Sequence, residues 1–300
     1  MGSDGGPIDL HIHSVFSDGS LTPSQIIEKA TRLGLRAISI TDHDTLAGSL
    51  EAQTTGIPGH LAFVTGVEIS AGLFEPFANA GTCHMLGYFL DPQNAPLTQA
   101  LAGLQQARRE RNPRILERLA GLGIKIDYQD VVRASGGGQV GRLHIARVLL
   151  ARGVVQTTDE AFERFLGRGG AAFVEKKSLP APEAIALIRQ AGGVSVLAHP
   201  SSLRMEDARL AALVGRLAAM GLGGLEVYYP NHGPDMVKKY RRLATEHHLA
   251  VTGGSDFHGD YKPKIEMGRG TGDLWVPFGV YEALRRFHKD HAAGGEACLG

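Results

Sequence analysis

The sequence predicts a barrel-like α/β fold that is interrupted by an all-helical insertion. About seven apolar runs of strand length recur along the 300-residue chain. Amphipathic helical patterns lie between many of these runs, and this alternation indicates βα units around a mainly parallel sheet. The strand pattern fades from about residue 96 to residue 178, where helical patterns follow one another. About seven strands favour closure into a barrel over a small open sheet.

The predicted strands are short and mostly apolar. In chain order they are I-D-L-H-I-H (8–13), A-I-S-I-T-D-H (37–43), A-F-V-T-G-V-E-I (62–69), H-M-L-G-Y-F-L (84–90), V-S-V-L-A-H-P (194–200), L-E-V-Y-Y-P (225–230) and A-V-T-G-G-S-D-F-H (250–258).

The helices between these strands carry recognisable start and stop signals. The first helix has Thr22 as its expected N-cap, Pro23 at its first position and Gly34 as its stop. Three more amphipathic helices are expected, over residues 181–192, 206–221 and 234–248.

Residues 96–178 are predicted to form a helical cap. The barrel is then discontinuous, over residues 7–95 and 179–290, and residues 291–300 form a tail. The cap begins with either one long helix or a pair broken near Pro113, and further helices are expected at 128–134, 142–152 and 158–166. The cap is rich in arginine, and most of these side chains, including Arg114 and Arg118, are expected on solvated helix faces.

Composition narrows the function classes. Lys+Arg and Asp+Glu balance at 31 each, which argues against nucleic-acid binding through a strong overall basic field. No apolar run reaches the roughly 18 residues that a membrane helix needs. Cys83 and Cys298 form no C-x-x-C pair, which fits a reducing, cytoplasmic setting without a thiolate metal site. Nothing in the sequence indicates an obligate protein partner.

Polar side chains gather at the predicted strand ends. A strand places alternate residues on one face, so His11 and His13 point the same way. The other candidates are Asp18, His43, Glu68, His84, His199, Asp256 and His258. Barrel active sites are built at this end of the strands, and imidazole with carboxylate suits zinc, manganese or iron. Nine candidates exceed the roughly four ligands of one ion, which favours two or three metals and phosphoester hydrolysis.

These motifs resemble the signature of the polymerase and histidinol phosphatase (PHP) family. The resemblance rests on D-L-H-I-H-S (9–14), I-T-D-H-D (40–44), G-V-E (66–68), L-A-H-P (197–200) and S-D-F-H (255–258), in that order. It implies a distorted (βα)7 barrel, similar to a TIM barrel, with a metal-dependent phosphoesterase site.

The resemblance also implies how the metals are shared. One metal would be held by His11, His13, Glu68 and Asp256, which would also hold a metal-bridging hydroxide as the nucleophile. A second would be held by His84 and His199, with Glu68 bridging the two ions. A third would be held by Asp18, His43 and His258. Manganese is the first choice, with zinc or iron as alternatives, and Asp42 is expected to orient an imidazole.

The cap and two further motifs narrow the resemblance to one branch of the family. V-G-R-L-H-I-A-R (140–147) and E-V-Y-Y-P-N-H (226–232) resemble the 3′,5′-nucleotide bisphosphate phosphatase and 5′→3′ exoribonuclease AM branch. The expected partner is a small phosphorylated nucleotide, such as a nucleoside 3′,5′-bisphosphate, or a short RNA 5′ end. Arginine binds phosphate through two parallel hydrogen bonds, so Arg142 is a candidate phosphate contact. His144, Lys176 and His232 are further candidates.

Three other functions remain open at the level of sequence. They are a histidinol-phosphate-type phosphatase, an amidohydrolase, which also uses histidine and aspartate clusters in a barrel, and a non-catalytic PHP module that binds a partner. The first is disfavoured by the cap, the second by the motif order, and the third because all nine ligand positions are filled.

Overall fold

The computed structural model describes residues 6–136 and 138–296. Seven strands form a nearly closed mixed barrel in the order β1–β2–β3–β4–β6–β7–β8, and a two-residue strand, β5, pairs with β3. The strands are β1 (Ile8–Ile12), β2 (Ala37–Ile40), β3 (Ala62–Gly72), β4 (Cys83–Tyr88), β5 (Leu179–Pro180), β6 (Val194–Leu197), β7 (Gly224–Tyr228) and β8 (Ala250–Gly253). A bridge from Ile12 to Phe257, just beyond β8, brings the two edges of the sheet together.

The expectation of βα alternation fails at one strand. A hairpin joins β3 to β4, so β4 runs antiparallel to both β3 and β6, whereas the other barrel pairs are parallel. The reversal has a consequence for the site. The start of β4 lies at the same edge as the carboxyl ends of the other strands, with His84 opposite Ser70 of β3.

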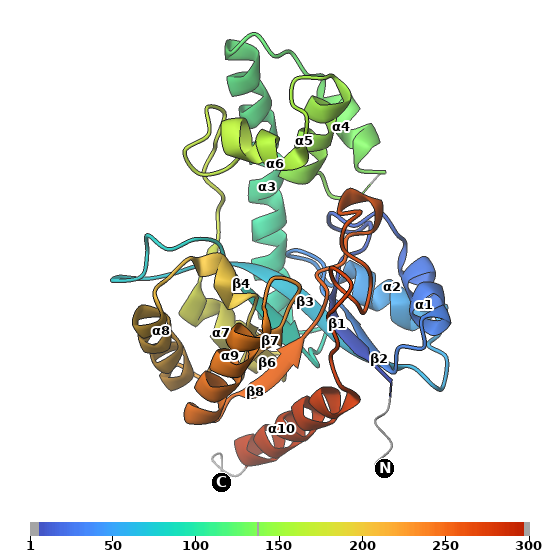
Figure 1. The fold of residues 1–300 in the computed structure, drawn as a ribbon, viewed down its shortest axis with the longest axis vertical. Helices are drawn as coiled ribbons and strands as arrows, with labels where there is room; N and C mark the ends of the chain where they lie inside the picture. Colours follow the sequence, from blue (N-terminus) through green and yellow to red (C-terminus); the bar gives the residue numbers. More distant parts are fainter. Residues whose placement is uncertain (1–5, 137, 297–300) are drawn as a thin grey trace.

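The barrel helices pack on the outside of the sheet, with α1 and α2 on one side and α7, α8 and α9 on the other (Figure 1). They are α1 (Pro23–Arg32), α2 (Ala47–Thr55), α7 (Ala181–Gln190), α8 (Asp207–Ala219) and α9 (Pro234–Glu246), with short 3₁₀ turns η2 (Pro200–Leu203) and η3 (Gly259–Tyr261). The expected caps of α1 are confirmed: Thr22 accepts from the Gln25 amide, and Gly34 adopts a positive φ of 69° beyond the helix end.

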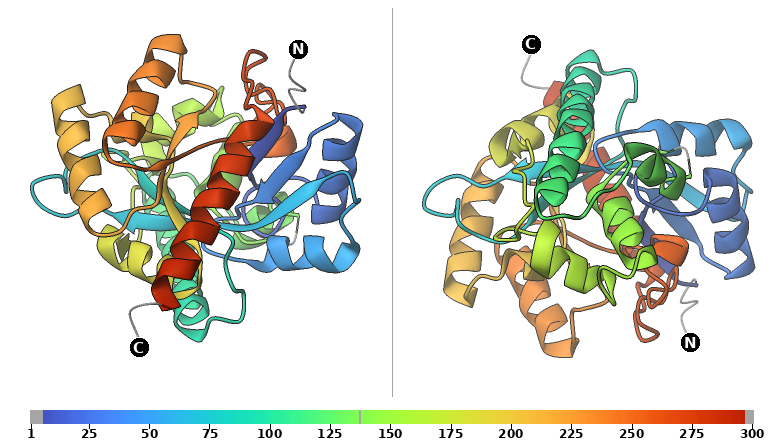
Figure 2. Two further views of the ribbon diagram at one scale, coloured as in Figure 1. Left: turned by 90° about the horizontal axis from the view of Figure 1, so that it is seen from below. Right: turned by 90° about the horizontal axis from the view of Figure 1, so that it is seen from above.

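Helix α10 (Phe278–Glu296) lies across the end of the barrel opposite the cap (Figure 2). Its Tyr281 and Leu284 pack with buried residues of β1, including Ile8 and Leu10. Residues 291–296 therefore belong to a helix, not to the predicted tail, and residues 297–300, with Cys298, lie outside the described residues.

The remaining helices stand above the barrel and are joined to it by α3 (Figure 1). They are α3 (Ala95–Gly121), α4 (Tyr128–Ala134), α5 (Arg142–Ala151), α6 (Thr158–Ala161) and the π-turn η1 (Phe162–Leu166). Of the two expectations for its start, one long helix is observed, with Pro113 inside it. Because the first half of α3 packs in the barrel core, we define the cap as residues 105–178 from here on, in place of the predicted 96–178.

Helix α3 belongs to two hydrophobic cores. Its first half places Leu97, Leu101 and Leu104 in the barrel core. Its second half places Ile115 and Leu119 in a separate core within the cap. The helix therefore fixes the cap above the barrel edge where the predicted ligands gather. Within the described residues, no helix is long and apolar enough to cross a membrane.

Candidate metal centre

The predicted ligands meet at one edge of the barrel, below the cap. His11 and Glu68 lie within β1 and β3, and His84 lies at the start of β4, whereas the others lie in loops at strand ends. Backbone strain occurs here too, because Asp44, His199 and Asp256 have positive φ values of 58°, 24° and 54°. Strained non-glycine residues of this kind cluster at functional sites.

Glu68 is the centre of the cluster. Its Oε1 lies 2.8 Å from His84 Nδ1 and 2.9 Å from His199 Nε2. Its Oε2 lies 2.9 Å from His43 Nδ1 and 3.3 Å from His13 Nε2. The carboxylate is almost fully buried, and each oxygen faces a different set of imidazoles, which is the arrangement that a bridging carboxylate needs.

A first group of ligand atoms lies beside Glu68 Oε2. His13 Nε2 lies 3.2 Å from Asp256 Oδ1, and His11 Nε2 lies 3.6 Å from the same oxygen. Together with Glu68, these three residues are the predicted ligands of the first metal, and the structure brings all four together.

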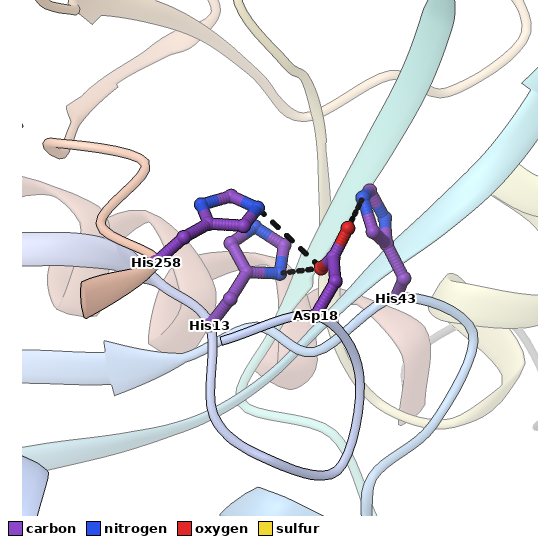
Figure 3. Close-up of side chains that lie close together, drawn as sticks. All are labelled: His13, Asp18, His43 and His258. Carbon is purple, nitrogen blue, oxygen red and sulfur yellow. Dashed lines mark ion pairs between the residues drawn. The ribbon is translucent and has the colours of Figure 1, made fainter. Parts of the chain in front are cut away.

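A second group surrounds Asp18 (Figure 3). Asp18 Oδ1 lies 3.4 Å from His258 Nε2 and 3.6 Å from His13 Nδ1, while Oδ2 lies 3.8 Å from His43 Nε2. Two imidazoles belong to more than one group: His13 joins this set, and His43 also groups with Glu68 and His84. The structure therefore does not separate the ligands as cleanly as the predicted three-metal scheme does.

The donor set fits divalent ions. Of the 16 buried side-chain nitrogen and oxygen atoms in the described residues that have no hydrogen bond of acceptable geometry, six belong to predicted ligands: His11 Nε2, His13 Nε2, Asp18 Oδ1, His43 Nδ1, Glu68 Oε2 and His84 Nδ1. Unsatisfied buried polar atoms are costly. All six belong to predicted ligands and face a common centre, so cations between them would satisfy these atoms.

Hydrogen bonds from residues outside the ligand set orient the ligands. Glu226, fully buried in β7, accepts from His11 Nδ1 at 2.9 Å and from the His199 amide at 2.6 Å. Asp42 accepts from the Ser17 hydroxyl at 2.6 Å, and that hydroxyl lies 3.3 Å from His13 Nδ1. Asp42 thus acts on an imidazole through Ser17. The sequence analysis did not single out Glu226, although a carboxylate inside an apolar strand was a signal.

The imidazoles of the cluster fall into two kinds, those with a raised pKa and those with a lowered pKa. Burial alone would lower the pKa of His13, but hydrogen bonds to Asp256 and Glu68 outweigh burial and raise this pKa to about 9. Burial lowers the pKa of His84 to about 3 in spite of Glu68. Burial also lowers the pKa of His258, to about 4, and the neighbouring Lys262 adds to the effect. Neutral imidazole is the metal-binding form, so ions would have to displace protons from His13 but not from His84 or His258.

A cavity of about 950 Å³ opens from this centre. Its wall includes predicted ligands and five cationic side chains from the cap: Arg108 and Arg111 of α3, Arg142 and Arg147 of α5, and Lys176. Of these five cations, Arg108 alone has an ion pair within the described residues, with Asp44.

Arg111 and Lys176 have no ion pair within the described residues. Arg111 is 5% exposed, and its Nε and Nη1 have no hydrogen-bond partner in the described residues. Burial, with Arg142 and Arg108 nearby, lowers the pKa of Arg111 to about 9. Burial also lowers the pKa of Lys176 to about 7; Asp44 opposes this shift, whereas the neighbouring Arg108 and Arg142 add to it. A buried cation with unpartnered nitrogens, such as Arg111, would be stabilised by an anion bound beside it.

The predicted phosphate contacts separate into two pairs. Arg142 and Lys176 line the cavity, and Arg142 is fixed by donating to the Leu166 carbonyl at 2.9 Å. His144 and His232 are not among the lining residues. His144 Nδ1 accepts from the Gly141 amide, and both His232 nitrogens are bonded, to the Val227 carbonyl and the Ser201 hydroxyl. Both nitrogens of His232 are therefore used within the fold, whereas His144 Nε2 has no hydrogen-bond partner among the described residues.

Arg108 and Arg111 were not predicted from the sequence as cavity residues. They continue the buried stripe of α3 at helical spacing, after Leu101 and Leu104 and before Ile115. A charged residue on an apolar stripe was therefore the signal that could have found them.

Together, the barrel with its multi-ligand centre and the comparisons with known proteins define a metal-dependent phosphoesterase. Residues 9–165 match the family model described as PHP domain. A 5′-3′ exoribonuclease of Haemophilus influenzae is 34% identical over 250 residues, covering 83% of this chain and 89% of the relative. A 3′,5′-nucleoside bisphosphate phosphatase of Chromobacterium violaceum is 31% identical over 268 residues, covering 89% and 92%.

The fold agrees with this assignment. A solved structure from Bifidobacterium adolescentis, assigned as a metal-dependent phosphoesterase, is 36% identical, covers 94% of this chain and 96% of its own, and superposes with a TM-score of 0.80. The chain belongs to the PHP family. The predicted family, fold class and enzyme class are thereby confirmed.

Proposed function

We propose that this protein hydrolyses the 3′-phosphate of nucleoside 3′,5′-bisphosphates and also acts on short 5′-phosphorylated RNA. One observation carries the proposal: uncompensated cations of the cap line the same cavity as the ligand cluster. A substrate with two phosphates fits this arrangement, because one phosphate occupies the metal centre while the second meets the cations.

The chain's own residues divide the work in this proposal. Arg111, Arg142 and Lys176 bind the second phosphate, since arginine offers two parallel donors and lysine a point charge. Arg108 is held by Asp44, and Asp44 accepts in turn from the Ser70 amide and hydroxyl. The role of Arg108 is therefore to position the neighbouring cations. Remote phosphate binding of this kind would position the reacting phosphate.

The cluster would hold two or three divalent ions, for which manganese is our choice. Bound there, such ions supply Lewis acidity to phosphoryl oxygens and lower the pKa of water to near neutrality. Glu226 keeps His11 turned toward the cluster. Substituting a ligand such as His13 or Asp256 by Asn should abolish turnover while the fold is retained.

The relatives support both substrate types. The two relatives described above are a 5′-3′ exoribonuclease and a 3′,5′-nucleoside bisphosphate phosphatase. Both substrates carry a 5′-phosphate and a 3′-phosphoester on the same ribose, so one cavity could accept either.

A substrate panel tests the proposal. The manganese-loaded protein would be given adenosine 3′,5′-bisphosphate, AMP, histidinol phosphate and a 5′-phosphorylated RNA oligomer at equal concentrations. We expect kcat/KM for the bisphosphate or the oligomer to exceed that for each monophosphate by at least tenfold. Equal rates on all four would remove the need for a second-phosphate site, and a preference for histidinol phosphate would contradict the proposed substrate class.

A further inference from the structure

The loop after β8 carries a lysine to the metal centre. Lys262 follows η3, and its Nζ donates to Asp256 Oδ2 at 2.8 Å. Its side chain is 36% exposed and lines the cavity. The sequence analysis gave this residue no role, since no periodicity or motif marks it.

Asp256 uses its two oxygens differently. Oδ1 faces the imidazoles of His11 and His13, whereas Oδ2 accepts from Lys262 and, at 2.9 Å, from the Tyr229 hydroxyl. Lys262 therefore binds the carboxylate on the side turned away from those imidazoles. An ammonium has three donors, and Lys262 Nζ has one hydrogen-bond partner among the described residues, so two donors remain for a group in the cavity.

The loop is fixed from both sides of the cavity. On the barrel side, the Asp260 amide donates to the Ser20 hydroxyl at 2.9 Å. On the cap side, the Tyr261 hydroxyl donates to the Ala134 carbonyl at 3.0 Å, and the Arg147 guanidinium lies 4.0 Å from the centre of the Tyr261 ring. The ammonium is thus held in place before a substrate arrives, as electrostatic catalysis requires.

We propose that Lys262 is a catalytic residue that donates to a non-bridging oxygen of the phosphate being hydrolysed while it stays bound to Asp256. Charge in phosphoryl transfer spreads over these oxygens, and a fixed cation beside them stabilises it more in the transition state than in the ground state. The inference rests on phosphoester hydrolysis at this centre and does not depend on the identity of the nucleotide.

The opposing interpretation is that Lys262 only orients or neutralises Asp256. Its removal would then change metal affinity, and saturating metal would restore turnover. If Lys262 instead donates a hydrogen bond to the phosphate, its removal lowers turnover and phosphate affinity even at saturating metal. Measurements at saturating metal therefore distinguish the two interpretations.

The test compares Lys262→Met and Lys262→Arg with the matched control Lys264→Met. Lys264 lies in the same loop and lines the same cavity, so the control removes an equal charge. Three quantities would be measured: the manganese Kd by calorimetry, kcat for p-nitrophenyl phosphate and adenosine 3′,5′-bisphosphate at saturating manganese, and the Kd of inorganic phosphate for the loaded protein.

For Lys262→Met we expect kcat to fall by about 10²-fold on both esters, the loss typical of one such donor. We expect phosphate affinity to fall at least fivefold and the manganese Kd to stay within threefold. Lys262→Arg should recover part of the loss, and Lys264→Met should stay within about twofold of the unaltered protein.

Either of two kinetic results would overturn the inference: full turnover by Lys262→Met at saturating manganese, or the same loss in Lys264→Met. Phosphate binding needs no turnover, so it reports on Lys262 even if the nucleotide bisphosphate is not the substrate. Phosphate affinity unchanged in Lys262→Met would also refute the proposed contact.

Discussion

Replacing Arg111 by methionine should weaken substrate binding and stabilise the protein at once. The side chain is buried on α3, and two of its nitrogens have no hydrogen-bond partner in the described residues. If it binds the second phosphate, the loss of one charged hydrogen bond of about 1.5–3 kcal/mol raises KM for the bisphosphate by about 10- to 150-fold. Removal of an uncompensated buried cation relieves about 1–3 kcal/mol, which raises Tm by a few degrees.

The assay needs two substrates and one control. Steady-state kinetics on adenosine 3′,5′-bisphosphate report the second-phosphate contact, whereas p-nitrophenyl phosphate has no second phosphate and should be turned over normally. Arg114→Met is the matched control, because Arg114 lies about one helical turn further along α3 and its side chain is exposed. Equal losses on both substrates, or a lower Tm for Arg111→Met, would refute the reasoning.

Three further predictions concern charge and metal. Glu226→Gln should weaken manganese binding by about 10- to 100-fold, measured by calorimetry, because His11 loses the carboxylate that orients it; unchanged affinity would contradict that role. The manganese Kd should fall as the pH rises from 7 to 9, because ions compete with the proton that His13 retains up to its pKa of about 9; a pH-independent Kd would contradict this. KM for the bisphosphate should rise as the pH increases through about 7, because Lys176 then loses its charge, and Lys176→Met should abolish that part of the pH profile; a profile that Lys176→Met leaves unchanged would count against the contact.

The barrel could be predicted because its strands are short apolar runs with polar residues at their ends. The same pattern brought Glu68, His84 and His199 to one place, since strand ends share an edge of the sheet. The direction of β4 was missed. An apolar run looks the same in both directions, and only the hairpin from β3 reverses it.

The substrate side of the site was harder to predict, because it is made by long-range packing. Arg111 is one of many arginines in the cap, and only the continuation of the apolar stripe of α3 marks it as buried. His144 looked like a phosphate contact beside a glycine-rich loop, but it occupies the third position of α5 and bonds to the Gly141 amide. Lys262 meets Asp256 only because the loop is fixed to both barrel and cap.

The most direct test of the account is a crystal structure of the manganese-loaded protein with a slowly hydrolysed thiophosphate analogue of adenosine 3′,5′-bisphosphate, with the ions located by anomalous scattering. We expect two or three manganese peaks around Glu68, one phosphate on those ions, and the second phosphate within hydrogen-bond distance of Arg111, Arg142 or Lys176. A single ion away from Glu68, or a second phosphate that points into solvent, would contradict it.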